Sequence, residues 1–91
     1  MFMTLAAVIT TLDTLATGRT GVVVSLAPGD LASTGVDVSR RLMELGFFPG
    51  EIVRVLKRGV PGGEPIAVKV GDSTFALRGF EAALISITPQ S

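Results

Sequence analysis

The first clear hydrophobic pattern is a run of apolar and β-branched side chains over residues 20–27, TGVVVSLA. Gly18 precedes this run, and the turn-forming sequence Pro-Gly-Asp follows it at residues 28–30. A short apolar run that is bounded by such residues is typical of a buried strand. The pattern therefore predicts a strand over residues 20–27 and then a loop over residues 30–36.

The hydrophobic period changes after this loop. Val38, Leu42 and Leu45 follow one another at the spacing of a single helical face, and the polar residues between them fall mostly elsewhere. The aspartate at position 37 can accept hydrogen bonds from the first amides of such a helix. We therefore expect a helix of about two turns over residues 37–45.

The end of this helix is the most tightly specified part of the chain. Gly46 takes the position at which a left-handed residue ends many helices, and Phe47 is then placed to contact Leu42. Proline and glycine at positions 49 and 50 suit the centre of a type II turn. Phe48 is either a second core residue, which is the more common outcome, or an exposed anchor for a partner.

Alternating apolar residues, separated by turn residues, predict three further strands over residues 51–60, 65–70 and 73–78. The two-residue turn at residues 71–72 sets the register of the last two strands. That register pairs Val70 with Ser73 and collects the large apolar side chains on one face of the hairpin.

The end of the chain completes the pattern. Residues 79–83 predict a single helical turn, and residues 84–88 a last strand before Pro89. Five short strands are too few for a β-sandwich. They predict a mainly β fold, a small SH3-like five-stranded barrel with its short helix inserted after the first strand and a one-turn helix before the last. A chain of 91 residues can bury one small core, so we expect a single domain over residues 1–91.

The first residues are apolar without being long enough to cross a bilayer. The longest charge-free stretch covers residues 1–12, whereas a spanning helix needs about 20 apolar residues. The stretch also lacks the basic leader of a secretory signal. We expect a cytoplasmic protein with no membrane span, in which residues 1–9 form a tail or a docked extension.

Composition narrows the chemistry. The chain contains no Cys and no His, which excludes disulfides, thiolate nucleophiles, Ser/His/Asp triads and the usual ligands of soft metals and haem. The acidic residues show no spacing that specifies a cation site. We therefore expect no catalytic residues, no metal ligands and no cofactor. An enzyme that uses carboxylates is the minority alternative, and it would require a pocket with two convergent acids.

The charges balance over the chain but not along it. Eight basic residues match eight acidic ones, whereas residues 40–78 carry seven basic against four acidic residues, a net charge of +3. Either this segment forms an ordinary solvated face or it steers an acidic partner. Because the whole chain is neutral and has no Trp or Tyr, binding of nucleic acid or of proline-rich peptides is a weak alternative to other protein contacts.

Residues 40–87 closely resemble the FeoA family of ferrous iron transport proteins. The shared features are the helix end (Arg41, Leu42, Glu44, Leu45 and Gly46), the Pro49-Gly50 turn, and a hairpin that ends in Leu77-Arg78 with Glu81-Ala82 shortly after. Residues 10–26 resemble the opening of the family's sequence, so the resemblance covers nearly the whole chain except residues 1–9.

The resemblance implies a small cytoplasmic SH3-like protein that assists FeoB, the bacterial membrane transporter with a G-protein domain that imports ferrous iron. Its role would be regulatory or scaffolding, through contact with the cytoplasmic G-protein domain and without catalysis. The alternative is the SH3-like regulatory module of iron- and manganese-dependent repressors, which the chain also resembles. The chain starts at Met1 with no preceding helix-turn-helix, and this favours the stand-alone transporter accessory.

We expect the partner surface at the helix end and the neighbouring barrel, where the periodicity leaves side chains outward. Its members are Arg40, Arg41, Glu44, Phe48, Arg58 and Asp30. The apolar composition, with 47% hydrophobic and 18% charged residues, also favours self-association into a homo-oligomer.

Overall fold

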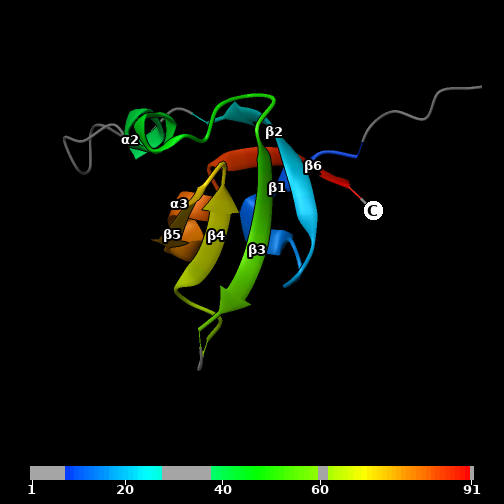
Figure 1. Ribbon diagram of the computed structural model, residues 1–91, viewed down its shortest axis with the longest axis vertical. Helices are drawn as coiled ribbons and strands as arrows, with labels where there is room; N and C mark the ends of the chain where they lie inside the picture. Colours follow the sequence, from blue (N-terminus) through cyan, green and yellow to red (C-terminus); the bar gives the residue numbers. More distant parts are fainter. Residues whose placement is uncertain (1–7, 28–37, 60–61, 91) are drawn as a thin grey trace, which may run out of the picture.

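The computed structural model of the protein describes residues 8–27, 38–59 and 62–90. These residues form one antiparallel sheet of six strands in the order β1-β6-β2-β3-β4-β5 (Figure 1). The strands are β1 (Thr10–Thr11), β2 (Thr20–Leu26), β3 (Ile52–Arg58), β4 (Ile66–Val70), β5 (Ser73–Leu77) and β6 (Ile85–Gln90). The helical segments are η1 (Leu12–Thr14), α2 (Val38–Leu45) and α3 (Gly79–Ala82). The mainly β prediction is confirmed, with the helix in the long connection after the first predicted strand.

The structure contains six strands where the sequence predicted five. The additional strand, β1, is two residues long and pairs with β6 at Ile87 and Ser86. It is too short to show an alternating pattern, and η1 begins directly after it. The expectation that the last strand ends before Pro89 was wrong, because β6 continues to Gln90. Proline is tolerated there because the pairing with β1 has already ended.

The predicted hairpin register is confirmed. Val70 pairs with Ser73, and the pairing continues with Val68 opposite Phe75 and Ile66 opposite Leu77. Lys69 and Thr74 alternate with this set and are exposed. The register is stable because a shift by one residue would move every large apolar side chain of the hairpin into solvent.

The end of α2 has the predicted Schellman geometry. Gly46 has a φ of +119°, its N–H donates to Met43 O at 3.0 Å, and the Phe47 N–H donates to Leu42 O at 3.1 Å. Phe47 is fully buried and its ring centroid lies 6.0 Å from that of Phe75. The helix is therefore joined to the core at its C-terminal end. The predicted capping aspartate at position 37 lies outside the described residues.

One face of the sheet forms the core, and two irregularities in the pairing expose apolar residues elsewhere. The register shifts between Val23 and Ser25 in β2 and between Val55 and Lys57 in β3. A bulge inserts an extra residue into one strand and changes which way its neighbours face. Val24 and Leu56 are exposed by 39% and 41%, whereas Val23 and Val55 are buried.

The sheet curls around its buried face, and η1 and α3 contact each other across it (Figure 1). Val8 and Ile9 are exposed where the described chain begins, and residues 1–7 and the predicted loop at residues 30–36 lie outside the described residues. Within the described ranges, no helix is long and apolar enough to span a membrane.

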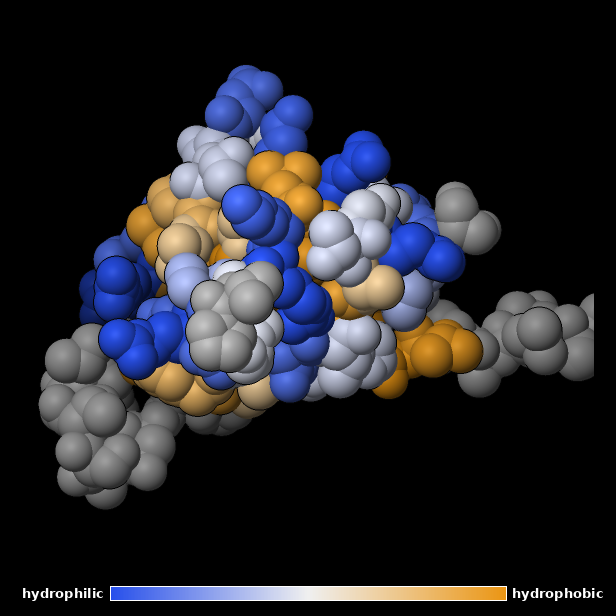
Figure 2. All heavy atoms as spheres, turned by 90° about the horizontal axis from the view of Figure 1, so that it is seen from below, coloured by the Kyte–Doolittle hydropathy of each residue, from blue (hydrophilic) through white to orange (hydrophobic). Residues whose placement is uncertain are grey.

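Hydrophilic side chains cover much of the end of the molecule opposite α2, and hydrophobic ones form separate patches there (Figure 2).

Candidate functional site

The turn after α2 is held firmly against β2. The Glu51 N–H donates to Phe48 O at 3.0 Å and Gly50 has a φ of +94°, as the predicted type II turn requires. The Gly50 N–H also donates to Val23 O at 2.7 Å, and the Val23 N–H donates to Glu51 O at 2.9 Å. These hydrogen bonds fix the backbone of the turn, and with it the position of Phe48.

A mainly apolar groove of about 440 Å³ lies between α2, this turn and the end of β2. Leu26, Ala27, Ser39, Arg40, Met43 and Pro49 contribute to its lining. The Ser39 hydroxyl donates to the Ala27 carbonyl oxygen, so the helix is tied to β2 inside the groove. We call this groove, together with Phe48, which precedes Pro49 in the chain, the α2 surface.

Phe48 and Met43 are the large, exposed apolar side chains of the α2 surface. Phe48 is 47% exposed and Met43 is 38% exposed. The more common outcome for Phe48, burial in the core, was therefore wrong: the Schellman end buries Phe47 and leaves its neighbour outside. Met43 was missed, although its position one residue after Leu42 already placed it off the buried face of the helix.

Three of the charged residues expected at the partner surface lie together on α2. Arg40 and Glu44 form an exposed ion pair at 3.7 Å, one helical turn apart. Arg41 reaches Glu81 of α3 at 3.9 Å, and the other carboxylate oxygen of Glu81 accepts the Arg78 N–H at 2.8 Å. The Arg40–Glu44 pair is exposed on both sides, and such pairs contribute about 0–1 kcal/mol. In the other pair the Arg41 side chain is exposed, whereas that of Glu81 is only 12% exposed.

The structure does not bring Arg58 together with the α2 residues. Arg58 ends β3, at the other end of the strand from α2 (Figure 1). Its guanidinium group donates to Asp13 O at 2.6 Å and to Leu15 O at 2.7 Å. It therefore fastens β3 to the η1 segment. Asp30, the remaining predicted member, lies outside the described residues.

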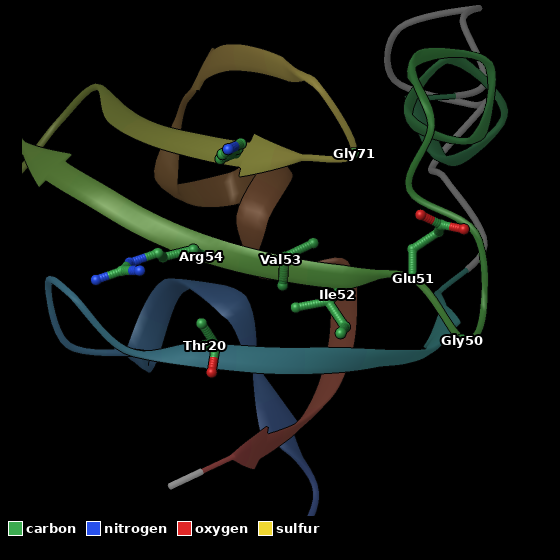
Figure 3. A pocket seen from close by; sticks show the side chains of 8 residues that line it. Thr20, Gly50, Glu51, Ile52, Val53, Arg54 and Gly71 are labelled. Atoms are coloured by element: carbon green, nitrogen blue, oxygen red, sulfur yellow. The ribbon is translucent and has the colours of Figure 1, made fainter.

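A second groove, of about 430 Å³, lies on the outer face of β2, β3 and β4. Thr20, Glu51, Ile52, Arg54 and Lys69 contribute to it, and the sequence prediction named none of them (Figure 3). Sequence alternation could have found Ile52, Arg54 and Lys69, since their neighbours Val53 and Val68 on the same strands are buried. In the described part of the chain, no three acidic residues gather as a metal site would require.

Comparison with known families decides what kind of chain this is. A model of the FeoA domain matches residues 10–89, which contain almost all of the described fold. The chain belongs to the FeoA family. A search of curated proteins found no match to this chain.

Solved FeoA structures share the fold of this FeoA-family chain. FeoA of Stenotrophomonas maltophilia, a zinc complex described as an SH3 domain protein, is 37% identical, with 88% of this chain and 94% of that chain covered and a TM-score of 0.75. FeoA of Chlorobium tepidum is 32% identical, with 89% and 70% covered and a TM-score of 0.70. The predicted SH3-like architecture is confirmed by these similarities.

A manganese-dependent transcriptional repressor also matches, at 21% identity and a TM-score of 0.72. The match covers 93% of this FeoA-family chain and 44% of the repressor chain. At this identity the likeness concerns the fold of the module alone, and function resides in side chains that a shared fold does not specify.

Proposed function

We propose that this FeoA-family protein is a cytoplasmic accessory of bacterial ferrous iron uptake, which contacts the G-protein domain of the transporter FeoB through the α2 surface. The Stenotrophomonas relative is described as a candidate activating factor of ferrous iron transport. Activation of a transporter by a small separate protein requires a contact surface. The proposal makes protein contact, without catalysis, the way in which this chain acts.

The exposed Phe48 on its rigid turn is the observation that carries the proposal. Burying the exposed part of a phenylalanine ring against a partner removes apolar surface from water, which contributes favourable binding free energy. The turn that carries Phe48 is hydrogen-bonded to β2 through Gly50 and Glu51, so little backbone freedom would be lost on binding. Aromatic and arginine side chains are common anchors of interfaces, and Arg40 and Arg41 lie on the helix that precedes the turn.

Substitution at Phe48 tests this proposal. We expect Phe48→Ala to weaken binding to the isolated FeoB cytoplasmic domain by at least about tenfold, since anchors of this type contribute more than 1 kcal/mol. Isothermal titration calorimetry in the absence of nucleotide and with GDP or a GTP analogue provides the measurement. The melting temperature should change little, because Phe48 is not part of the core.

Leu56→Ala is the matched control, because Leu56 is also exposed, by 41%, and lies toward the other end of β3. It should bind the domain as the unchanged protein does. Equal weakening by both substitutions would mean that Phe48 acts only through general hydrophobicity. Absence of binding at tens of micromolar in every nucleotide state would refute the transporter as the partner.

A further inference from the structure

Two basic side chains oppose each other on the outer face of the sheet. Arg54 of β3 lies in register with Lys69 of β4, and both are exposed because Val53 and Val68 take the buried face. The Cβ atoms of directly opposed residues are about 4.5–5.5 Å apart, a separation at which like charges repel each other. The pair therefore opposes folding instead of assisting it.

Three other basic residues of this part of the chain already have partners. Arg40 and Arg41 form ion pairs, and Arg58 donates to backbone carbonyl groups. No described carboxylate forms an ion pair with Arg54 or Lys69. Arg54 and Lys69 are therefore two adjacent basic side chains of residues 40–78 that can contact an acidic partner.

The groove beneath this pair combines charge with apolar surface. Thr20 of β2 lies opposite Arg54 of β3, which in turn lies opposite Lys69 of β4. A hydroxyl group and two cations therefore form a row across the three strands. Ile52, 56% exposed, lines the same groove. Glu51 lies at the far end, with its carboxylate well away from Arg54 (Figure 3).

We infer that this outer-face groove binds an acidic segment of a partner protein, in which an Asp or Glu lies beside an apolar side chain. The carboxylate contacts Arg54 and Lys69 and relieves their mutual repulsion, and the apolar side chain covers Ile52. Arginine suits this role because its planar guanidinium group can hold a carboxylate through two parallel hydrogen bonds. The occupant is an extended segment, since the groove lies on the outer face of neighbouring strands.

The surrounding chemistry favours a protein segment over nucleic acid. A nucleic-acid site gains its affinity from many phosphate contacts and from stacking on aromatic rings. This groove offers two cations and no aromatic side chain among its lining residues, on a chain with zero net charge. A free phosphate ion would leave Ile52 exposed.

The inference goes beyond the proposed function, because this groove and the α2 surface share no lining residue and the test does not involve the transporter. The probe is a capped peptide of sequence Gly-Asp-Leu-Glu-Ile-Gly, added to the whole ¹⁵N-labelled protein at low ionic strength. We expect saturable amide shifts at Thr20, Ile52, Arg54 and Lys69. The neutral peptide Gly-Asn-Leu-Gln-Ile-Gly should bind at least about threefold more weakly.

Single charge removals locate the binding. Arg54→Gln and Lys69→Gln should each weaken binding of the acidic peptide by at least about threefold. Arg78→Gln is the matched control, because Arg78 is an exposed base outside this groove, and it should leave affinity within twofold. All three sites are exposed, so the variants should fold, and unchanged spectra without peptide check this.

Four results would overturn the inference. The first is that Arg78→Gln weakens binding of the acidic peptide as much as Arg54→Gln and Lys69→Gln do. The second is equal affinity for the acidic and the neutral peptide, and the third is no amide shift at millimolar acidic peptide. The fourth is that an oligothymidine binds more tightly than the acidic peptide and that Arg54→Gln abolishes its binding. The last result would assign the groove to nucleic acid. None of them bears on the calorimetric test of the α2 surface, so the two proposals can fail separately.

Discussion

At the scale of single residues, two neighbouring phenylalanines have opposite environments. Phe47 is fully buried and packs against Phe75, whereas Phe48 is 47% exposed. The cause is local: Gly46 ends the helix with a positive φ, and the next two side chains leave the backbone in different directions. The same chemical group therefore serves the core at one position and remains available to a partner at the next.

Arg54 and Lys69 show a second effect at this scale, a repulsion that one substitution can reverse. Lys69→Glu places a carboxylate opposite Arg54, and we expect the free energy of unfolding to rise by about 0.2–1 kcal/mol. Chemical denaturation at low and at high salt measures the change, and the gain should shrink as salt screens the pair. A loss of stability at low salt would show that the two cations do not repel each other in the folded protein.

At the scale of elements, the end of α2 determines how the helix and the following turn meet the sheet. The two hydrogen bonds to Met43 O and Leu42 O close the helix, and the turn at residues 48–51 then bonds to β2. This element was predictable in detail, because glycine, proline and the hydrophobic residues around them all favour the same local conformation. The hairpin of β4 and β5 was predictable for the same reason.

Gly46→Ala tests the helix end. A φ of +119° is strained for any residue with a Cβ atom, and the added Cβ would lie 3.8 Å from Val70 Cγ1, which is ordinary contact. The cost therefore comes from the backbone, and we expect a loss of about 1–2 kcal/mol in the free energy of unfolding. Urea denaturation measures it. An unchanged midpoint would mean that the helix end relaxes without loss.

At the scale of the whole molecule, the fold depends on contacts between residues far apart in the sequence. β6 lies between β1 and β2, so the two ends of the described chain pair with each other. Arg58 joins the end of β3 to the carbonyl groups around η1, 43 and 45 residues away. Such contacts leave no periodic signal, which is why β1 was missed and why Arg58 was expected at the partner surface.

Arg58→Ala tests this long-range contact. Removing the guanidinium group leaves two partly buried carbonyl groups without their donor, and we expect a loss of about 1–3 kcal/mol in the free energy of unfolding. Thermal and urea denaturation measure it, and Arg58→Lys should restore part of the loss. Affinity for the FeoB domain, measured below the melting temperature, should stay unchanged. Weakened binding without lost stability would instead place Arg58 in the interface.

By itself the sequence determined the local elements and the chemistry that is absent. These local elements are strand alternation, the helix end, the two turns and the hairpin register. Each depends on the conformational preferences of residues that are close together in the sequence. Only the tertiary structure decided which charged residues have a hydrogen-bond or ion-pair partner and which apolar residues are exposed to solvent. Four arginines show this, because the same side chain has three different environments. Arg40 and Arg41 form ion pairs, Arg58 donates hydrogen bonds to distant carbonyl groups, and Arg54 lies opposite a second cation.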